Sequence, residues 1–186
     1  MQFNLNQTRL LVLCGDSDLL VEIDMVAGTT VDEMPLGKSP ELFELSPDQK
    51  TVYASIEDDA VLAAYDRKTK KQIFAISTGG EPEGVLIAAD GEIAYVTSEE
   101  ANLVHVIDLP TRTITKNLKV GDRPRRFAIT NDGQEVWVTN ELSASVSVID
   151  TRTQTVKDTI RFEISGIRAN RITPVGIVMS SDNRTA

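Results

Sequence analysis

Four aspartates recur every 42 residues along the chain, and each of them ends an apolar run. They are Asp24, Asp66, Asp108 and Asp150. Glycine and proline residues keep the same step, as Gly37 and Pro40, Gly79 and Pro82, and Gly121 and Pro124. Self-similarity at a period of about 40 to 45 residues, carried by short apolar segments, is typical of a repeat architecture built from small sheets.

Aligned on its aspartates, each repeat predicts four antiparallel strands. Turn pairs such as Asp90-Gly91 and Asp132-Gly133 separate the first strand from the second. The second strand is aromatic and β-branched, the third ends at the periodic aspartate, and the fourth is more polar, as suits an outer edge. No helical periodicity competes with this pattern. The sequence therefore predicts an all-β protein, a β-propeller with four-stranded antiparallel blades of about 42 residues.

About four blades fit into the chain, which we interpret as one partial propeller over residues 1–186. The repeat units cover residues 1–36, 37–78, 79–120 and 121–164, and residues 173–186 begin the next unit. Both ends fall inside a unit: Met1 to Asn4 match only the end of a first strand, and Thr173 to Ser180 predict a first strand alone. Two interpretations stay open. The chain is a fragment of a larger propeller, or its last strand completes the first unit, in a four-bladed ring of one chain or an eight-bladed ring of two.

Composition excludes several partner classes. With 28 acidic and 19 basic residues, the net charge is −9. This balance predicts no nucleic-acid partner, because phosphate binding needs a basic surface. No apolar stretch approaches the roughly 20 residues that span a bilayer, so we expect no membrane insertion. The residues from Met1 to Asn6 have neither a basic leader nor an apolar core, so this chain shows no signal peptide.

Several segments resemble known propeller repeats. Tyr95–Thr97, Trp137–Asn140 and Val146–Thr151 resemble the YVTN-type repeat. A narrower set is similar to the β-propeller protein family associated with PQQ-dependent catabolism, namely Pro40–Phe43, Glu81–Gly84, Arg123–Arg125, Phe162–Arg168 and Pro174–Gly176. That resemblance implies a periplasmic location and a role alongside PQQ-linked alcohol oxidation, with a quinoprotein dehydrogenase system as a candidate partner. It supplies no catalytic residues.

An irregularity in the fourth unit marks the candidate binding site. The proline spacing rises from 42 to 50 residues between Pro124 and Pro174, so eight extra residues precede the last strand. Insertions on one face of a repeat array often build the binding surface. The insertion carries Arg168 and Arg171, and the same face receives Arg123, Arg125 and Arg126. These arginines predict a patch for an anionic ligand or a protein partner, because a guanidinium binds carboxylates through two parallel hydrogen bonds.

Acidic loops face the arginines, which opens a second interpretation. The acids are Glu57, Asp58, Asp59, Glu99, Glu100 and Glu141. Glu99 and Glu141 either take part in ligand recognition or simply neutralise the arginines as loop ion pairs.

His105 is the single histidine, and it replaces Val21, Ala63 and Ser147 at equivalent third-strand positions. That equivalence predicts a packing site between blades. The alternative is contact with a non-covalent redox cofactor such as a heme, which a position facing the central channel would favour. No second histidine or paired cysteine accompanies it, so the sequence predicts neither a metal site nor a resident cofactor.

Other conspicuous residues have structural interpretations. We expect the periodic aspartates to cap turns through hydrogen bonds, because a threonine follows three residues after Asp66, Asp108 and Asp150. Cys14 and Trp137 are expected to be buried in the core.

The leading functional prediction is a non-catalytic binding or accessory protein. An enzyme of the lactonase or hydrolase type is the main alternative, since charged loops around a channel can carry such chemistry. The sequence contains no nucleophile elbow, phosphate loop or dinucleotide fingerprint, so it assigns no catalytic residue.

Overall fold

The computed structural model describes all 186 residues as an all-β chain of sixteen strands. Every sheet consists of four consecutive strands that pair antiparallel in chain order, and we call these sheets blades 1 to 4. Blade 1 comprises β1 (Gln2–Phe3), β2 (Arg9–Cys14), β3 (Leu19–Asp24) and β4 (Thr29–Pro35). Blade 2 comprises β5 (Pro40–Leu45), β6 (Thr51–Ile56), β7 (Val61–Asp66) and β8 (Lys71–Ser77).

Blades 3 and 4 repeat the arrangement. Blade 3 comprises β9 (Pro82–Ile87), β10 (Ile93–Ser98), β11 (Leu103–Asp108) and β12 (Thr113–Lys119). Blade 4 comprises β13 (Pro124–Ile129), β14 (Glu135–Asn140), β15 (Ser145–Asp150) and β16 (Thr155–Arg161). Three short 3₁₀ turns complete the structure, η1 (Gly15–Ser17), η2 (Glu141–Ser143) and η3 (Ala169–Arg171). No helix has the length and apolar character that crossing a bilayer requires.

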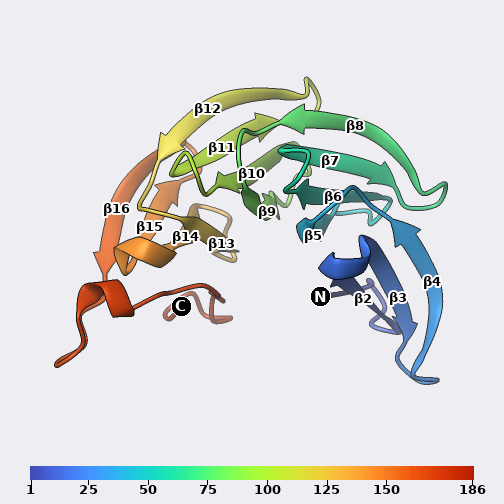
Figure 1. The fold of residues 1–186 in the computed structure, drawn as a ribbon, viewed down its shortest axis with the longest axis horizontal. Coiled ribbons are helices and arrows are strands. Elements are labelled where there is room, and N and C mark those ends of the chain that lie inside the picture. Colours follow the sequence, from blue (N-terminus) through green and yellow to red (C-terminus); the bar gives the residue numbers. More distant parts are fainter.

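The blades stand side by side along an open arc (Figure 1). The fourth strands β4, β8, β12 and β16 lie on the outside of the arc, and the first strands β5, β9 and β13 lie on the inside. This is the radial arrangement of a β-propeller, so the predicted fold class is confirmed.

Side chains hold the turns that the repeat predicts. The carboxylate of Asp66 accepts hydrogen bonds from the backbone N–H of Thr69 at 2.6 Å and from its hydroxyl at 2.8 Å. Asp108 and Asp150 make the same pair of bonds to the threonine three residues later. In blade 1, Asp24 accepts from two backbone N–H groups instead. The capping interpretation of the periodic aspartates is confirmed.

Apolar side chains between neighbouring blades form the core. The cluster between blades 1 and 2 includes Leu11, Leu20 and Met34 on one side and Phe43 and Val52 on the other. A second cluster joins blades 2 and 3, and a third joins blades 3 and 4. Because side chains alternate along a strand, each middle strand contributes to the interfaces on both of its sides.

Two residues that were expected in the core are only half-buried. Tyr95 has 2% of its surface exposed, whereas Trp137, at the equivalent position of blade 4, is partly exposed. Cys14 is likewise partly exposed. The physical reason is the same for both residues, because each lies on a side of its blade that no neighbouring blade covers. Trp137 lies on the uncovered side of blade 4, and Cys14 lies on the uncovered side of blade 1.

The strand expected at Thr173 to Ser180 is also absent, because no second strand lies beside it to complete a hydrogen-bonded ladder. The segment is extended without strand pairing. It nevertheless ends in a turn, where the N–H of Ser180 donates to the carbonyl of Thr185 at 2.8 Å.

Candidate functional site

The predicted arginines lie where the first strand of blade 4 begins, next to the corresponding part of blade 3. Positions one period apart in the two blades carry opposite charges there: Glu83 of β9 corresponds to Arg125 of β13, and Glu81 corresponds to Arg123. Because neighbouring first strands lie side by side, the repeat brings the arginines of blade 4 against the glutamates of blade 3.

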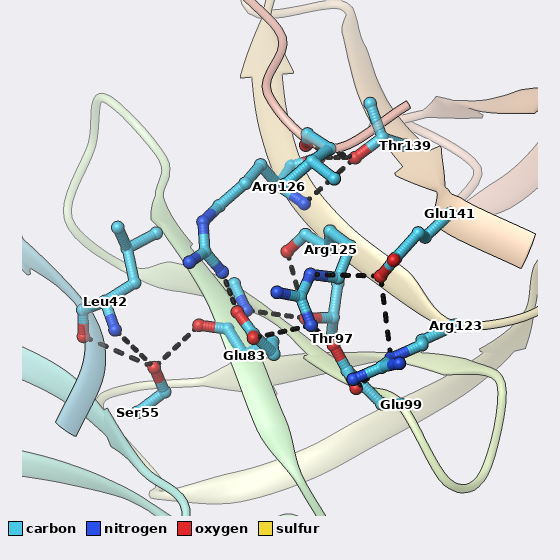
Figure 2. Close-up of polar contacts among 12 residues, drawn as sticks. Leu42, Ser55, Glu83, Thr97, Glu99, Arg123, Arg125, Arg126, Thr139 and Glu141 are labelled. Atoms are coloured by element: carbon cyan, nitrogen blue, oxygen red, sulfur yellow. Dashed lines mark hydrogen bonds and ion pairs between the residues drawn. The ribbon is translucent and has the colours of Figure 1, made fainter. Parts of the chain in front are cut away.

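The arginines form a closed network with these acids (Figure 2). The Nε of Arg123 lies 2.6 Å from Glu99 Oε2, and the Nη1 of Arg125 lies 2.8 Å from Glu83 Oε1. Arg125 also pairs with Glu99, and Arg126 pairs with Glu83.

Glu141 joins the network from blade 4 itself. Its Oε2 lies 3.5 Å from the Nε of Arg123 and 3.6 Å from the Nε of Arg125. The three guanidinium groups therefore face three carboxylates, and the cluster has no net charge. The side chains of Glu99 and Glu83 are only 3% and 8% exposed, so two carboxylates of the network are buried, whereas the side chain of Arg123 is 44% exposed.

The surroundings shift the pKa values of two arginines in opposite directions. The hydrogen bond to Glu99 and the charge of that carboxylate raise the pKa of Arg123. Burial lowers the pKa of Arg126, while the charge of Glu41 opposes the shift. Both side chains remain cationic at neutral pH, because an arginine pKa lies far above it.

Blade 2 has acids at the equivalent positions, but neither forms an ion pair with an arginine. Glu41 and Glu57 correspond to Glu83 and Glu99. Burial raises the pKa of Glu57, and a hydrogen bond with Glu41 together with the charges of Glu41, Glu81 and Asp58 raises it further. Blade 2 thus adds to this face carboxylates that no arginine neutralises.

The insertion lies on the same face but outside the network. Its 3₁₀ turn η3 lies against η2, which contains Glu141. Arg168 and Arg171 are exposed and form no ion pair. Two apolar side chains of the loop, Ile164 and Ile167, are 51% and 48% exposed.

The structure therefore divides the predicted arginine patch. Five of its residues, Arg123, Arg125, Arg126, Glu99 and Glu141, come together and neutralise one another. Arg168 and Arg171 stay separate and unpaired. Sequence reasoning missed Glu83, which pairs with two arginines, although its one-period relationship to Arg125 was a usable signal.

His105 lies between blades and not in the central channel. It sits on β11, cross-strand from Asn117, whose Oδ1 is 2.7 Å from the His105 Nδ1. The side chain is 6% exposed, and its Nε2 has no partner. The packing interpretation of His105 is therefore confirmed. No group of three or more His, Cys, Asp or Glu side chains is arranged to hold a metal ion.

Four radial sheets of four antiparallel strands, repeated every 42 residues, define this protein as a β-propeller of the repeat type. More specifically, the chain belongs to the cytochrome D1 heme domain family, a family of eight-bladed β-propellers, whose model matches residues 48–184. A comparison with curated proteins gives no match.

Solved structures share the fold at low sequence identity. Hydrazine synthase of Kuenenia stuttgartiensis is 21% identical, with a TM-score of 0.79 over 87% of this chain and 48% of that one. A functionally unknown protein from Desulfotomaculum acetoxidans DSM 771 is 17% identical, with a TM-score of 0.79 over 98% of this chain and 59% of that one. The chain thus spans about half the length of these structures.

Proposed function

We propose that this protein is a non-catalytic binding propeller that contacts an acidic protein partner through its inserted loop, residues 162–172. The observation that carries the proposal is the contrast between the two groups of arginines. Arg123, Arg125 and Arg126 are neutralised by glutamates, whereas Arg168 and Arg171 are exposed and unpaired. Exposed Ile164 and Ile167 add apolar surface to the same loop. Arginine beside apolar surface is the composition that protein interfaces favour.

The geometry gives less support to an enzyme of the lactonase or hydrolase type. Such a site needs polar groups that converge on a pocket and remain free to act on a substrate. Here the arginines and glutamates that converge are paired in charge with one another, although Arg125 Nε and Glu141 Oε2 lack a hydrogen-bond partner, and the single histidine is enclosed between two blades.

The family name implies a heme, and the residues of this chain do not fit one. His105 is the only histidine, and blade packing together with the bond to Asn117 keeps its ring from the channel. Arg123, Arg125 and Arg126 would be the cations for heme carboxylates, but they are already paired with buried glutamates. We therefore assign no heme-binding role to these residues.

Titration with hemin tests that assignment. We expect no change in the Soret absorption band of hemin that depends on His105, so His105→Ala and the unmodified chain should give the same spectra. A band shift that appears with the unmodified chain and disappears in the variant would overturn the assignment.

The resemblance to the PQQ-associated family supports a more specific version of the proposal. In this version the protein acts in the periplasm beside PQQ-linked alcohol oxidation, and its partner is a quinoprotein alcohol dehydrogenase.

Biolayer interferometry with a purified quinoprotein alcohol dehydrogenase tests the partner and the loop together. We expect Arg168→Ala combined with Arg171→Ala to weaken binding by more than tenfold, because each lost guanidinium leaves a partner carboxylate unpaired. The matched control is Lys68→Ala combined with Arg152→Ala, which removes the same charge from exposed turns elsewhere. Absence of binding, or equal weakening in both double variants, would contradict the proposal.

A further inference from the structure

The turns that follow the first strands lie at the face opposite the arginine network, because that network lies where the first strands begin. Successive blade junctions are filled differently at these turns. Between blades 1 and 2, the side chain of Gln49 crosses the junction and accepts a hydrogen bond from the N–H of Leu5 at 3.0 Å. Between blades 2 and 3, one period later, Pro47 fills the space, since a β-carbon at Gly91 would lie 3.1 Å from the proline Cδ.

The junction between blades 3 and 4 has neither filling. The residues one period further on are Ala89 and Gly133, and a β-carbon at Gly133 would have no other atom within 4 Å. A third position differs as well, because Thr151 stands where blade 3 has Leu109. Leu109 is 6% exposed and belongs to the core between blades 2 and 3. These small residues leave a hollow of about 370 Å³ between blades 3 and 4.

The hollow has an apolar lining that contains one unpartnered hydroxyl. Ile93 of β10 and Ile129 of β13 line it, and both side chains are half-buried. Tyr95 also lines it, although only 2% of that residue is exposed. The hydroxyl of Tyr95 forms no hydrogen bond within the protein, whereas the hydroxyl of Tyr65 accepts one from the N–H of Gly37 at 3.0 Å. Because an unpaired buried hydroxyl is unfavourable, a polar group of a ligand would be stabilised there.

Asp90 lies at the rim of the hollow and lacks a hydrogen bond that its counterparts have. In blade 4, the carboxylate of Asp132 accepts a hydrogen bond from the hydroxyl of Thr130 at 2.6 Å, and a serine makes the same bond in blade 2. Blade 3 has Ala88 at this position, so Asp90 accepts only the N–H of Glu92, at 2.9 Å. The carboxylate of Asp90 therefore keeps free acceptor positions where it lines the hollow.

The charges around the hollow favour a cation. Burial raises the pKa of Tyr95, and the charges of Asp90 and Asp150 raise it further. The Tyr95 hydroxyl therefore keeps its proton at neutral pH and lies in the field of two carboxylates. One guanidinium, that of the exposed Arg152, also lines the hollow and offsets one of these two charges. The net charge close to the hydroxyl is thus negative, which disfavours an anionic ligand.

We propose that the hollow between blades 3 and 4 binds a small organic amine with an apolar body. The ammonium group donates hydrogen bonds to the carboxylate of Asp90 and to the hydroxyl of Tyr95, and the apolar body packs against Ile93 and Ile129. Sites for small ligands have volumes of about 300 to 1,000 Å³ and combine an apolar lining with a few polar groups, as this hollow does. The site is separate from the inserted loop, since it lies at the opposite end of the first strands.

Isothermal titration calorimetry with three matched compounds tests the ligand class. The compounds are 2-phenylethylamine, 2-phenylethanol and phenylacetate, which share a phenyl ring on a short chain and differ in charge. We expect the amine to bind with a Kd of about 1 mM, the alcohol to bind several-fold more weakly, and the carboxylate to show no binding. An amine that fails to bind, or that binds no more tightly than the alcohol or the carboxylate, would overturn the proposal.

Asp90→Asn tests the carboxylate. We expect it to weaken binding of the amine about fivefold, as for a charge pair close to solvent, and to leave binding of the alcohol unchanged. The asparagine oxygen can still accept the N–H of Glu92, so the turn is kept. The matched control is Asp48→Asn, which changes the corresponding turn of blade 2, at the junction that Pro47 fills. Equal weakening in both variants would show unspecific attraction to an acidic surface and would contradict the site.

Filling the hollow tests its location. Ala89→Pro combined with Thr151→Leu copies Pro47 and Leu109 of the junction between blades 2 and 3. We expect this double variant to keep the circular dichroism spectrum of the unmodified chain and to lose binding of 2-phenylethylamine. Binding that persists in the folded double variant would place the amine elsewhere and refute the assignment. If the double variant does not fold, the comparison of Asp90→Asn with its control decides the same question.

Discussion

Gly84 on β9 faces Arg125 on β13 so closely that a β-carbon at Gly84 would lie 2.2 Å from the carbonyl oxygen of Arg125. The ring of Phe127 would lie 3.2 Å from the same β-carbon. The N–H of Gly84 donates to the hydroxyl of Thr97 at 2.6 Å, and that hydroxyl also bonds to Arg125. Glycine at this position therefore lets the first strands of blades 3 and 4 approach each other and align the charge network.

We predict that Gly84→Ala destabilises the protein by about 1 to 3 kcal/mol, because the added methyl forces the two strands apart. Urea denaturation measures the change in the free energy of unfolding. Gly176→Ala is the control, since Gly176 is the equivalent residue after blade 4 and a β-carbon there would have no other atom within 4 Å. Equal effects of the two substitutions would show that strand approach is not the cause.

The buried carboxylate of Glu99 forms ion pairs with two arginines. Its loss would leave the guanidinium group of Arg125, whose side chain is only 18% exposed, with fewer partners, and it would also remove a partner of the more exposed Arg123. Removing one partner of a buried ion pair costs about 3 to 5 kcal/mol. We therefore predict that Glu99→Ala lowers the free energy of unfolding by about 3 kcal/mol, measured by urea denaturation.

The control for Glu99 is a pair at the surface. Lys50 and Asp48 form an ion pair at 3.0 Å, and their side chains are 79% and 55% exposed. Lys50→Ala should leave stability nearly unchanged, because water and salt screen exposed pairs. If both substitutions had equally small effects, the network around Glu99 would be a solvated loop cluster.

The fold could be predicted because its signals are local and repeat. Each aspartate turn, aspartate-glycine turn and aromatic second strand depends on residues close in sequence, and the 42-residue period multiplies the signal. Trp137 and Cys14 were misplaced for a reason that lies outside this local pattern. Their positions are core positions in the interior blades, and only the arrangement in space shows that blades 1 and 4 each have an uncovered side.

The candidate site was predicted only in part. The shared face of the insertion and the arginines followed from propeller connectivity. The glutamates that pair with the arginines could not be predicted from this connectivity. Pairing depends on how far Glu83 and Glu99 lie from Arg125, which belongs to a neighbouring blade. The decisive distinction, between neutralised Arg125 and unpaired Arg168, requires side-chain positions.

The threonine that follows Asp66, Asp108 and Asp150 should matter for stability at neutral pH. The hydroxyl and the backbone N–H of Thr111 lower the pKa of Asp108, because both bonds favour the ionised carboxylate. A lowered pKa in the folded state contributes stability above the ordinary pKa, and this contribution disappears as the pH falls through the folded-state value.

We accordingly predict that Asp108→Asn lowers the Tm at pH 7 and that the difference in Tm from the unmodified chain shrinks in strong acid. Differential scanning calorimetry across this pH range measures the effect. Blade 1 supplies an internal comparison, because Ala27 stands where the later blades have threonine. Ala27→Thr should raise the Tm at neutral pH. A difference for Asp108→Asn that did not depend on pH would argue against a role for the carboxylate charge.

Glu44 on β5 should destabilise the folded protein above neutral pH. Burial raises the pKa of Glu44 from 4.5 to about 7, against opposing effects of the amino terminus and of a hydrogen bond from the backbone of Leu45. Since the folded state holds this proton more tightly than the unfolded state, stability from this group is complete below pH 4.5 and is lost as the pH rises toward 7. Glu44→Gln abolishes the penalty and should stabilise the protein by about 3 kcal/mol above pH 7, with no gain near pH 4.

Glu44→Leu, which copies Leu86 of blade 3, should show the same pH dependence relative to the unmodified chain. Urea denaturation from pH 4 to pH 8 measures both differences, and a gain that is equal at all pH values would rule out ionisation of Glu44 as its cause.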